Sequence, residues 1–186
     1  MGQGYIAAIL SDDGKIIRTY VHPHAYNNGY KLIEHSYIGN NFMEAVESLI
    51  CPTGMFYKSR LVWAGDYADV EPCGKSLYEL VDERPHSNPQ VELSNGKSVT
   101  SDYLYVVNHT KQEYMFKGPA SSDLGKQGQH LHCLSIMTAE GNGRGGGDYD
   151  GPGMELVGTW ARDVISVEKE VPVGFIHVPN VFDLYS

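Results

Sequence analysis

Cysteine is scarce in this sequence, which limits the covalent chemistry the chain can use. The 186 residues contain three cysteines, Cys51, Cys73 and Cys133. Their number is odd, their spacing is wide, and no pair has the C-x-x-C or Cys/His spacing of a zinc knuckle. These features argue against a disulfide framework and a structural zinc site. We therefore expect free thiols in a reducing compartment.

Long apolar runs are also missing. No segment approaches the run of about 20 apolar residues that crosses a bilayer. The opening residues, Met1–Tyr5, lack the basic and apolar regions of a secretory signal. We therefore expect a cytoplasmic protein that makes no membrane contact.

Basic residues are too few for a polyanion-binding surface. The chain has 14 lysines and arginines against 23 acidic residues, a formal net charge of −9. Proteins that bind nucleic acid through its phosphates usually show a basic excess or a basic stripe. We therefore expect no direct nucleic acid binding. An acidic surface is consistent with ordinary solubility or with a basic protein partner.

The residue pattern predicts the α+β class: one domain over residues 1–186, built on a mostly antiparallel or mixed β-sheet with two short helices. Asp13-Gly14 between two apolar runs is typical of a β-hairpin. One helix is predicted to follow Asn41, whose side chain would cap it with the help of Glu44, and the other covers 76–83. Strands are predicted at 5–10, 15–21, 60–64, 103–108, 113–117, 130–138 and 173–178, with a weak hairpin within 84–101. Residues 155–167 are predicted to form one long bent strand or a tight hairpin.

The most biased segment of the chain is rich in glycine. Seven glycines lie within the 13 positions from 141 to 153. Such backbone can approach a ligand closely, its N–H groups can surround a phosphate, and an arginine can add a bidentate contact. The segment matches neither a Walker loop nor a dinucleotide fingerprint, and a simple connecting loop explains it equally well. The ligand contacts predicted here are Asn142, Arg144, Gly145 and Asp148.

Histidines and carboxylates gather in the first third of the chain. His22 and His24 would share one side of a strand, and Glu34 and His35 follow shortly after. Two histidines and a carboxylate can bind a metal, but scattered histidines with local hydrogen bonds are commoner. We expect no bound metal and no cofactor. Instead, His22, His24, Glu34, His35 and Asp66 are predicted to contact a ligand together with the glycine-rich segment.

Three short motifs resemble those of the calcineurin-like metallophosphoesterases, in the same order along the chain. They are Gly65–Asp69 (GDYAD), Asn108-His109 and His130–His132. The family's opening D-x-H-G motif is replaced by Ser11–Gly14, which has no histidine, and Gln129 stands where the last motif has glycine. The resemblance implies a metal-dependent hydrolase. Asp66 and His109 belong to these motifs, and together with the nearby histidines His22, His24 and His35 they would be the candidate residues of such a hydrolase.

Four longer sequence segments are similar to segments of an uncharacterised family of small bacterial and bacteriophage proteins. They lie at 22–40, 61–69, 105–114 and 137–168. The resemblance implies a phage or prophage context, hence the host cytoplasm, and one site shared by the polar phrases. It carries no known activity and assigns no catalytic residue.

Three functions therefore stay open. The first is binding of a small phosphorylated or nucleotide-like ligand through the glycine-rich segment. The second is an acidic inhibitor or interaction protein that acts on a host defence factor. The third is a metal-dependent phosphoesterase-like hydrolase. The identity of the ligand and the oligomeric state are left undetermined.

Overall fold

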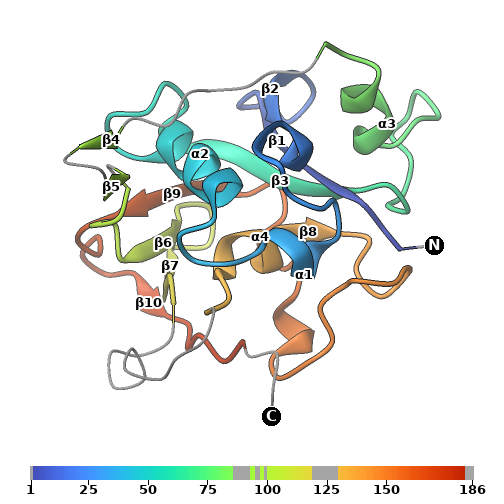
Figure 1. Cartoon of the computed structure of the whole chain (residues 1–186). Helices are drawn as coiled ribbons and strands as arrows, with labels where there is room; N and C mark the ends of the chain where they lie inside the picture. The colour runs from blue at the N-terminus through green and yellow to red at the C-terminus, as the bar shows by residue number, and fades with distance from the viewer. Residues whose placement is uncertain (1, 86–92, 95–96, 99, 119–129, 183–186) are drawn as a thin grey trace.

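The computed structural model of the chain describes residues 2–85, 93–94, 97–98, 100–118 and 130–182 (Figure 1). Within these residues one mixed eight-stranded sheet is accompanied by four α-helices and a separate two-stranded hairpin. The predicted α+β class is confirmed. None of the helices in the described part of the chain is long and apolar enough to cross a membrane.

The main sheet has the strand order β10-β7-β6-β9-β3-β1-β2, and β8 pairs with β3. The pairs β10–β7 and β3–β8 are parallel, and the others are antiparallel. The strands are β1 Tyr5–Leu10, β2 Ile17–Val21, β3 Ser59–Gly65, β6 Tyr105–Asn108, β7 Glu113–Phe116, β8 Ala139–Glu140, β9 Val164–Glu168 and β10 Ile176–His177. The small hairpin pairs β4 Leu93–Ser94 with β5 Lys97–Ser98.

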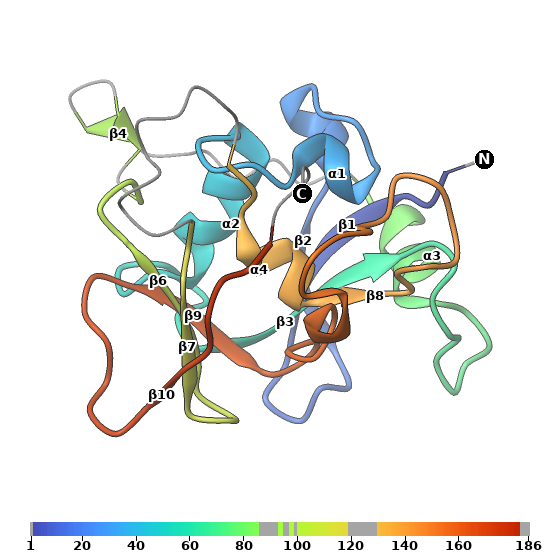
Figure 2. The same ribbon diagram turned by 90° about the horizontal axis from the view of Figure 1, so that it is seen from below.

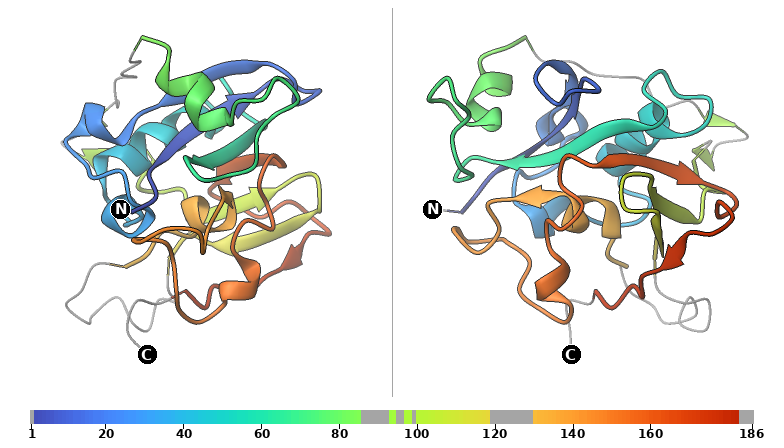
Figure 3. Two further views of the ribbon diagram at one scale, coloured as in Figure 1. Left: turned by 90° about the vertical axis from the view of Figure 1, so that its right-hand side faces the viewer. Right: turned by 180° about the vertical axis from the view of Figure 1, so that it is seen from behind.

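The central strands β1 and β3 are buried on both faces. Ile6, Ala8 and Leu10 of β1 pack towards helix α3, Leu77–Asp82. The alternate residues of β1 join the larger core, which also contains residues of α2, Asn41–Ile50, and α4, Cys133–Met137. Helices therefore cover both faces of this part of the sheet (Figures 1 and 3). A strand covered on both faces is a continuous apolar run, as the sequence YIAAIL is.

Both predicted helices exist, but the first is capped by a different residue. The Asn40 side chain accepts hydrogen bonds from the backbone N–H groups of Phe42 (2.9 Å) and Met43 (3.3 Å). Asn41 is already the first helical residue, so the prediction that it caps α2 was wrong by one position. Ser76 and Glu79 form a reciprocal capping box at the start of α3.

Two further helices were not predicted, and one of them replaces a predicted strand. Residues 133–137 form α4, with the His132 ring accepting a hydrogen bond from Leu134 N–H. The strand predicted at 130–138 is therefore wrong. All five residues of α4 are buried, and a short, fully buried apolar run has no periodicity that separates helix from strand. The other unpredicted helix is the short α1, Leu32–His35.

The predicted strand at 155–167 is confirmed only at its end. Met154–Leu156 form a 3-10 helix and turns follow, so that β9 begins at Val164. The Gly/Ser/Lys-rich composition of 118–129 predicts a loop, and all of this segment except Gly118 lies outside the described residues.

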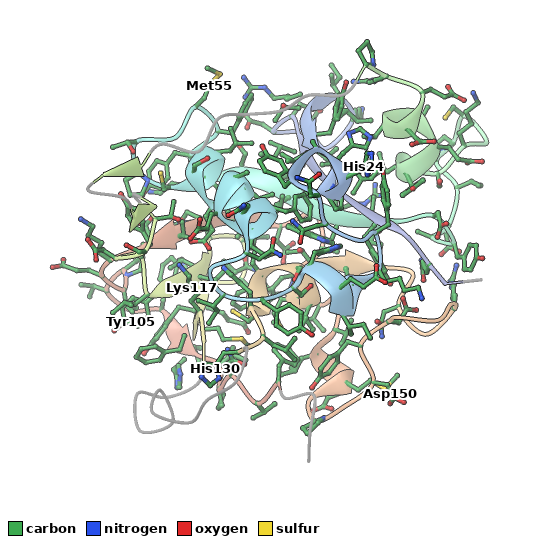
Figure 4. All side chains as sticks on the ribbon, in the orientation of Figure 1. His24, Met55, Tyr105, Lys117, His130 and Asp150 are labelled. Atoms are coloured by element: carbon green, nitrogen blue, oxygen red, sulfur yellow. The ribbon has the colours of Figure 1, made fainter. Side chains whose placement is uncertain are left out.

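A buried charged cluster joins α2, α4 and the end of β7. Glu47 accepts hydrogen bonds from the Lys117 ammonium (2.8 Å) and from His132 Nε2–H (2.7 Å). The Lys117 ammonium also donates to the Thr100 carbonyl oxygen (3.1 Å). Lys117 is labelled in Figure 4. Burial acts to raise the pKa of Glu47, but His132 and Lys117 outweigh it and lower that pKa. The carboxylate therefore stays ionised inside the core.

Candidate functional site

Three of the four segments predicted to share one site, 22–40, 61–69 and 137–168, meet around the start of β1, whereas Asn108 and Lys111 of segment 105–114 contact Asp163. Gln3 N–H donates to the Gly146 carbonyl oxygen (3.0 Å), and Ile33 N–H donates to the Gly147 carbonyl oxygen (3.1 Å). On the other side, Gly4 N–H donates to the Asp66 carboxylate (3.0 Å). The glycine-rich segment, drawn in orange, runs beside the N-terminal strand in Figure 2. Segments 22–40, 65–69 and 140–150 thus surround residues 2–5.

Asp148 occupies the inside of the glycine-rich loop. One carboxylate oxygen accepts hydrogen bonds from Gly143 N–H (2.7 Å) and Gly145 N–H (3.2 Å). The other accepts from the Tyr5 hydroxyl (2.7 Å). Successive backbone N–H groups of this kind form an anion-binding concavity. Here the protein's own carboxylate fills it, so a phosphate would have to displace Asp148.

The other predicted loop residues also have partners within the chain. Asn142 exchanges hydrogen bonds with the backbone of Tyr149 (3.1 and 2.9 Å). Arg144 donates to the Asp69 carboxylate (2.8 Å) and to the Tyr67 carbonyl oxygen (3.0 Å). A Cβ at Gly145 would lie 2.6 Å from the Cβ of Gln3, so close packing requires glycine there. Ligand contact by these residues stays a prediction, while their observed role is to hold the loop.

Two substitutions should show which contacts of this loop contribute to stability, the exposed ion pair of Arg144 or the internal hydrogen bonds of Asp148. Arg144→Ala should leave the urea midpoint unchanged, because both partners of the Arg144–Asp69 pair are well exposed. Asp148→Asn should lower the free energy of unfolding by about 1–3 kcal/mol, because an amide cannot accept all the hydrogen bonds that the carboxylate accepts. Equilibrium urea unfolding of both variants checks this. A large loss of stability in Arg144→Ala, with none in Asp148→Asn, would contradict this prediction.

The predicted residues of segment 22–40 lie in different surroundings. His22 is buried and meets the Tyr20 ring edge-on (5.4 Å between centroids), while the exposed His24 stacks on Tyr30 (6.2 Å). The Glu34 carboxylate accepts from the backbone N–H of Lys31 (3.1 Å) at the start of α1. None of these side chains lines either of two cavities of about 510 Å³ formed by described residues.

His35 is held inside the core by both ring nitrogens. Nδ1 donates to the Gly29 carbonyl oxygen (2.9 Å), and Nε2 accepts from the Trp63 indole N–H (2.9 Å). Nδ1 therefore carries the proton and the ring is neutral. Burial lowers the pKa of His35 to about 4. Neither nitrogen is available to a ligand without loss of a core hydrogen bond.

The candidate metal ligands do not assemble. Among the residues that the structure describes, no group of three or more His, Cys, Asp or Glu side chains is arranged to hold a metal ion. His35 packs against Phe42 and Trp63, whereas His109 follows β6 and contacts Phe175. The metal-dependent hydrolase therefore has no supporting geometry in this part of the chain.

A different region offers a cavity with reactive side chains. A hollow of about 510 Å³ lies over β9, between Tyr57-Lys58 before β3 and His109 after β6. Tyr103 and residues 168–172 complete most of its wall. We call it the His109 cavity. Figure 3 (right) shows β9 between β3 and β6. The volume of the His109 cavity lies within the range of about 300–1,000 Å³ that is typical of small-molecule sites.

Strand alternation puts Ser166 and Glu168 of β9 on the same face of the sheet, and Glu168 lines the His109 cavity. Ile165 and Val167 of β9 point into the core. Ser166 and Glu168, one residue out of phase, therefore point to the other face of the sheet. Val107 is paired with Ser166 and Tyr105 with Glu168 across the β6–β9 ladder.

A continuous hydrogen-bond chain joins two lining residues, His109 and Glu168, through Ser166, which does not itself line the cavity. His109 Nε2 lies 2.7 Å from Ser166 Oγ, and Ser166 Oγ donates to Glu168 Oε1 (2.8 Å). The Tyr57 hydroxyl donates to the same carboxylate oxygen (2.6 Å). Ser166 is fully buried, so its hydroxyl links other groups and is not an exposed nucleophile. Burial, followed by the nearby Lys58 charge, lowers the pKa of His109.

Two lysines that line the cavity have no carboxylate partner among the described residues. The Lys58 ammonium lies 5.1 Å from the centre of the Tyr57 ring, and the Lys169 ammonium lies 5.4 Å from that of Tyr103. Neither forms an ion pair within the described residues. Lys58 also has a left-handed backbone (φ 55°), uncommon for a residue other than glycine. Such strain is often found where a side chain must be placed for function.

Sequence reasoning missed most of the His109 cavity. The sequence motifs indicate His109 only as a metal ligand, and they single out none of Tyr57, Lys58, Ser166 and Lys169. The alternation of VISVE could have indicated that Ser166 and Glu168 share a face. No sequence signal brings 57–58, 109 and 166–169 together, because only the strand order β6-β9-β3 makes them neighbours.

Comparison of the chain with protein-family models, curated proteins and solved structures found no match.

Proposed function

We propose that this protein binds a small phosphorylated ligand in the His109 cavity. The observation that carries the proposal is that Lys58 and Lys169 line one cavity and form no ion pair with a carboxylate among the described residues. In a chain of net charge −9, most anions are repelled at long range. Glu168 and Glu170 also line the cavity, so an anion can bind there only through direct contact with the ammonium groups of Lys58 and Lys169, which can supply charge-assisted hydrogen bonds to a phosphate.

The aromatic walls extend the proposal to nucleotide-like ligands. The Tyr57 and Tyr103 rings line the same cavity as the two lysines. A planar base or another ring can pack on an aromatic face while its phosphate contacts the ammonium groups. The glycine-rich loop is the weaker candidate for this role, because its inward N–H groups already bind Asp148.

Calorimetric titration with inorganic phosphate, pyrophosphate and nucleoside monophosphates tests this function. Lys58→Gln and Lys169→Gln should each weaken binding about tenfold, the effect of losing one charge-assisted hydrogen bond. Lys75→Gln is the matched control, since Lys75 pairs with Glu83 and does not line the cavity. Equal affinity in all four proteins, or no binding by the unmodified chain, would refute the proposal.

The second candidate is the acidic interaction protein acting on a host factor, and one surface favours it. Tyr105, Tyr114, Phe116 and His177 form a connected group of rings on β6, β7 and β10, with centroids 4.8–6.4 Å apart. Phe116 is 38% exposed, and exposed aromatic groups of this kind are typical anchors in protein interfaces. Phe116→Glu would disrupt this surface without altering the residues that line the His109 cavity, so the two functions can be tested separately.

A further inference from the structure

The hydrogen-bond chain in the His109 cavity fixes where its protons lie. A carboxylate only accepts, so Tyr57 and Ser166 must both donate to Glu168. Ser166 has a single hydroxyl proton, which this bond uses. Its Oγ must therefore accept the hydrogen bond from His109, and Nε2 carries the ring proton. In the neutral ring the lone pair is then on Nδ1.

The Nδ1 atom of His109 is the basic position that this hydrogen-bond chain leaves unused. Within the described residues Nδ1 makes no hydrogen bond, although the His109 side chain lines the cavity. A proton taken up at Nδ1 would turn the ring into an imidazolium. Its Nε2–H would still point to Ser166, and through Ser166 to the negative charge of Glu168.

We propose that the His109 cavity hydrolyses phosphodiesters, with His109 Nδ1 as the general base that activates water. This inference rests on the proposed binding of a phosphorylated ligand in the same cavity. Water transfers a proton to Nδ1 as its oxygen forms a bond to phosphorus, and one P–O ester bond breaks. The imidazolium then returns the proton to the departing alkoxide. The products are a phosphomonoester and an alcohol, so atoms and charge balance.

Several features of the cavity match this chemistry. Lys58 and Lys169 are placed to stabilise charge on the non-bridging oxygens. A diester benefits more than a monoester from an activated nucleophile, because monoester transfer passes through a loose transition state in which the nucleophile contributes little. Ser166 is fully buried and cannot reach the substrate. Ser166 is therefore a positioning residue, which fixes the ring tautomer and links the ring to Glu168, whose negative charge stabilises the imidazolium.

Hydrolysis of bis(4-nitrophenyl) phosphate by the full chain tests the proposal. His109→Gln should lower kcat/KM at least about 100-fold, the lower end of what a general base contributes. Ser166→Ala should lower kcat with little change in KM, because the hydroxyl does not touch the substrate. Activity of the unmodified chain should fall on acidification through the His109 pKa, which lies below its ordinary value. Glu168→Gln should move this acid limb to lower pH, since Glu168 raises the His109 pKa.

Two controls separate this proposal from the binding function. Inorganic phosphate should still bind Ser166→Ala with the affinity of the unmodified chain, measured by calorimetry. Long-range ¹⁵N–¹H correlation spectra should show His109 as the Nε2–H tautomer. An Nδ1–H tautomer would overturn the proposal. The proposal would also be overturned if the unmodified chain binds phosphate but hydrolyses the diester no faster than His109→Gln does. Failure of the unmodified chain to bind inorganic phosphate would overturn the proposed binding function as well.

Discussion

Replacing Glu47 with glutamine should lower the free energy of unfolding by about 3–5 kcal/mol, the typical cost of breaking a buried ion pair by removing one partner. The Glu47 side chain is 1% exposed and that of Lys117 is 9% exposed. Without the carboxylate, the ammonium of Lys117 keeps only the Thr100 carbonyl oxygen as a described partner. His132 Nε2–H would also lose its ionic acceptor.

Urea unfolding of matched variants measures this loss. Glu44→Gln is the control, because Glu44 lies on the same helix, is partly exposed and takes part in no ion pair among the described residues. The double variant Glu47→Leu/Lys117→Met should recover only part of the stability, because it removes both charges together but leaves the buried His132 Nε2–H without its acceptor. A loss below about 1 kcal/mol for Glu47→Gln, in the range of an exposed pair, would show that Lys117 is solvated and not buried.

Acidification should destabilise the fold through His35. Burial lowers its folded pKa from 6.5 to about 4, so the unfolded chain binds a proton at a higher pH than the folded chain does. Stability is therefore complete above about pH 6.5 and is lost as the pH falls towards 4. A tenfold difference in proton affinity corresponds to about 1.4 kcal/mol, so a change from about pH 7 to about pH 5 should cost about 2 kcal/mol from this residue.

The His35 contribution can be isolated with one variant. His132 and His109 also have lowered pKa values, so they act in the same direction. The difference in pH dependence between the unmodified chain and His35→Gln gives the His35 part. Glutamine has both a donor and an acceptor for Gly29 and Trp63 but does not titrate. An identical pH dependence in the two proteins would contradict a neutral His35 in the core.

The sequence predicted those parts of the fold that local patterns encode. The Asp13-Gly14 hairpin, helix α2 and helix α3 each have a turn or capping signal within a few residues. The α4 segment has no such signal, because its five residues are all buried and its cap is a histidine, His132. Its helical form comes from tertiary packing.

Of the two candidate sites, the sequence indicated the glycine-rich segment but not the His109 cavity. Composition alone identified the glycine-rich segment, and the structure places it beside segments 22–40 and 65–69. Composition could not show that Asp148 fills the loop from inside, because this depends on the direction of one side chain. The His109 cavity depends on strand order, which joins segments about 50 residues apart that share no sequence motif.

Titration of the ¹⁵N-labelled chain with inorganic phosphate, followed by amide chemical shifts, tests the central claim most directly. We predict that the amides of Lys58, His109, Glu168 and Lys169 shift together with one dissociation constant, while those of Gly143 and Gly145 do not move. Shifts confined to the glycine-rich loop, or no saturable shift at the His109 cavity, would contradict the assignment of the binding site.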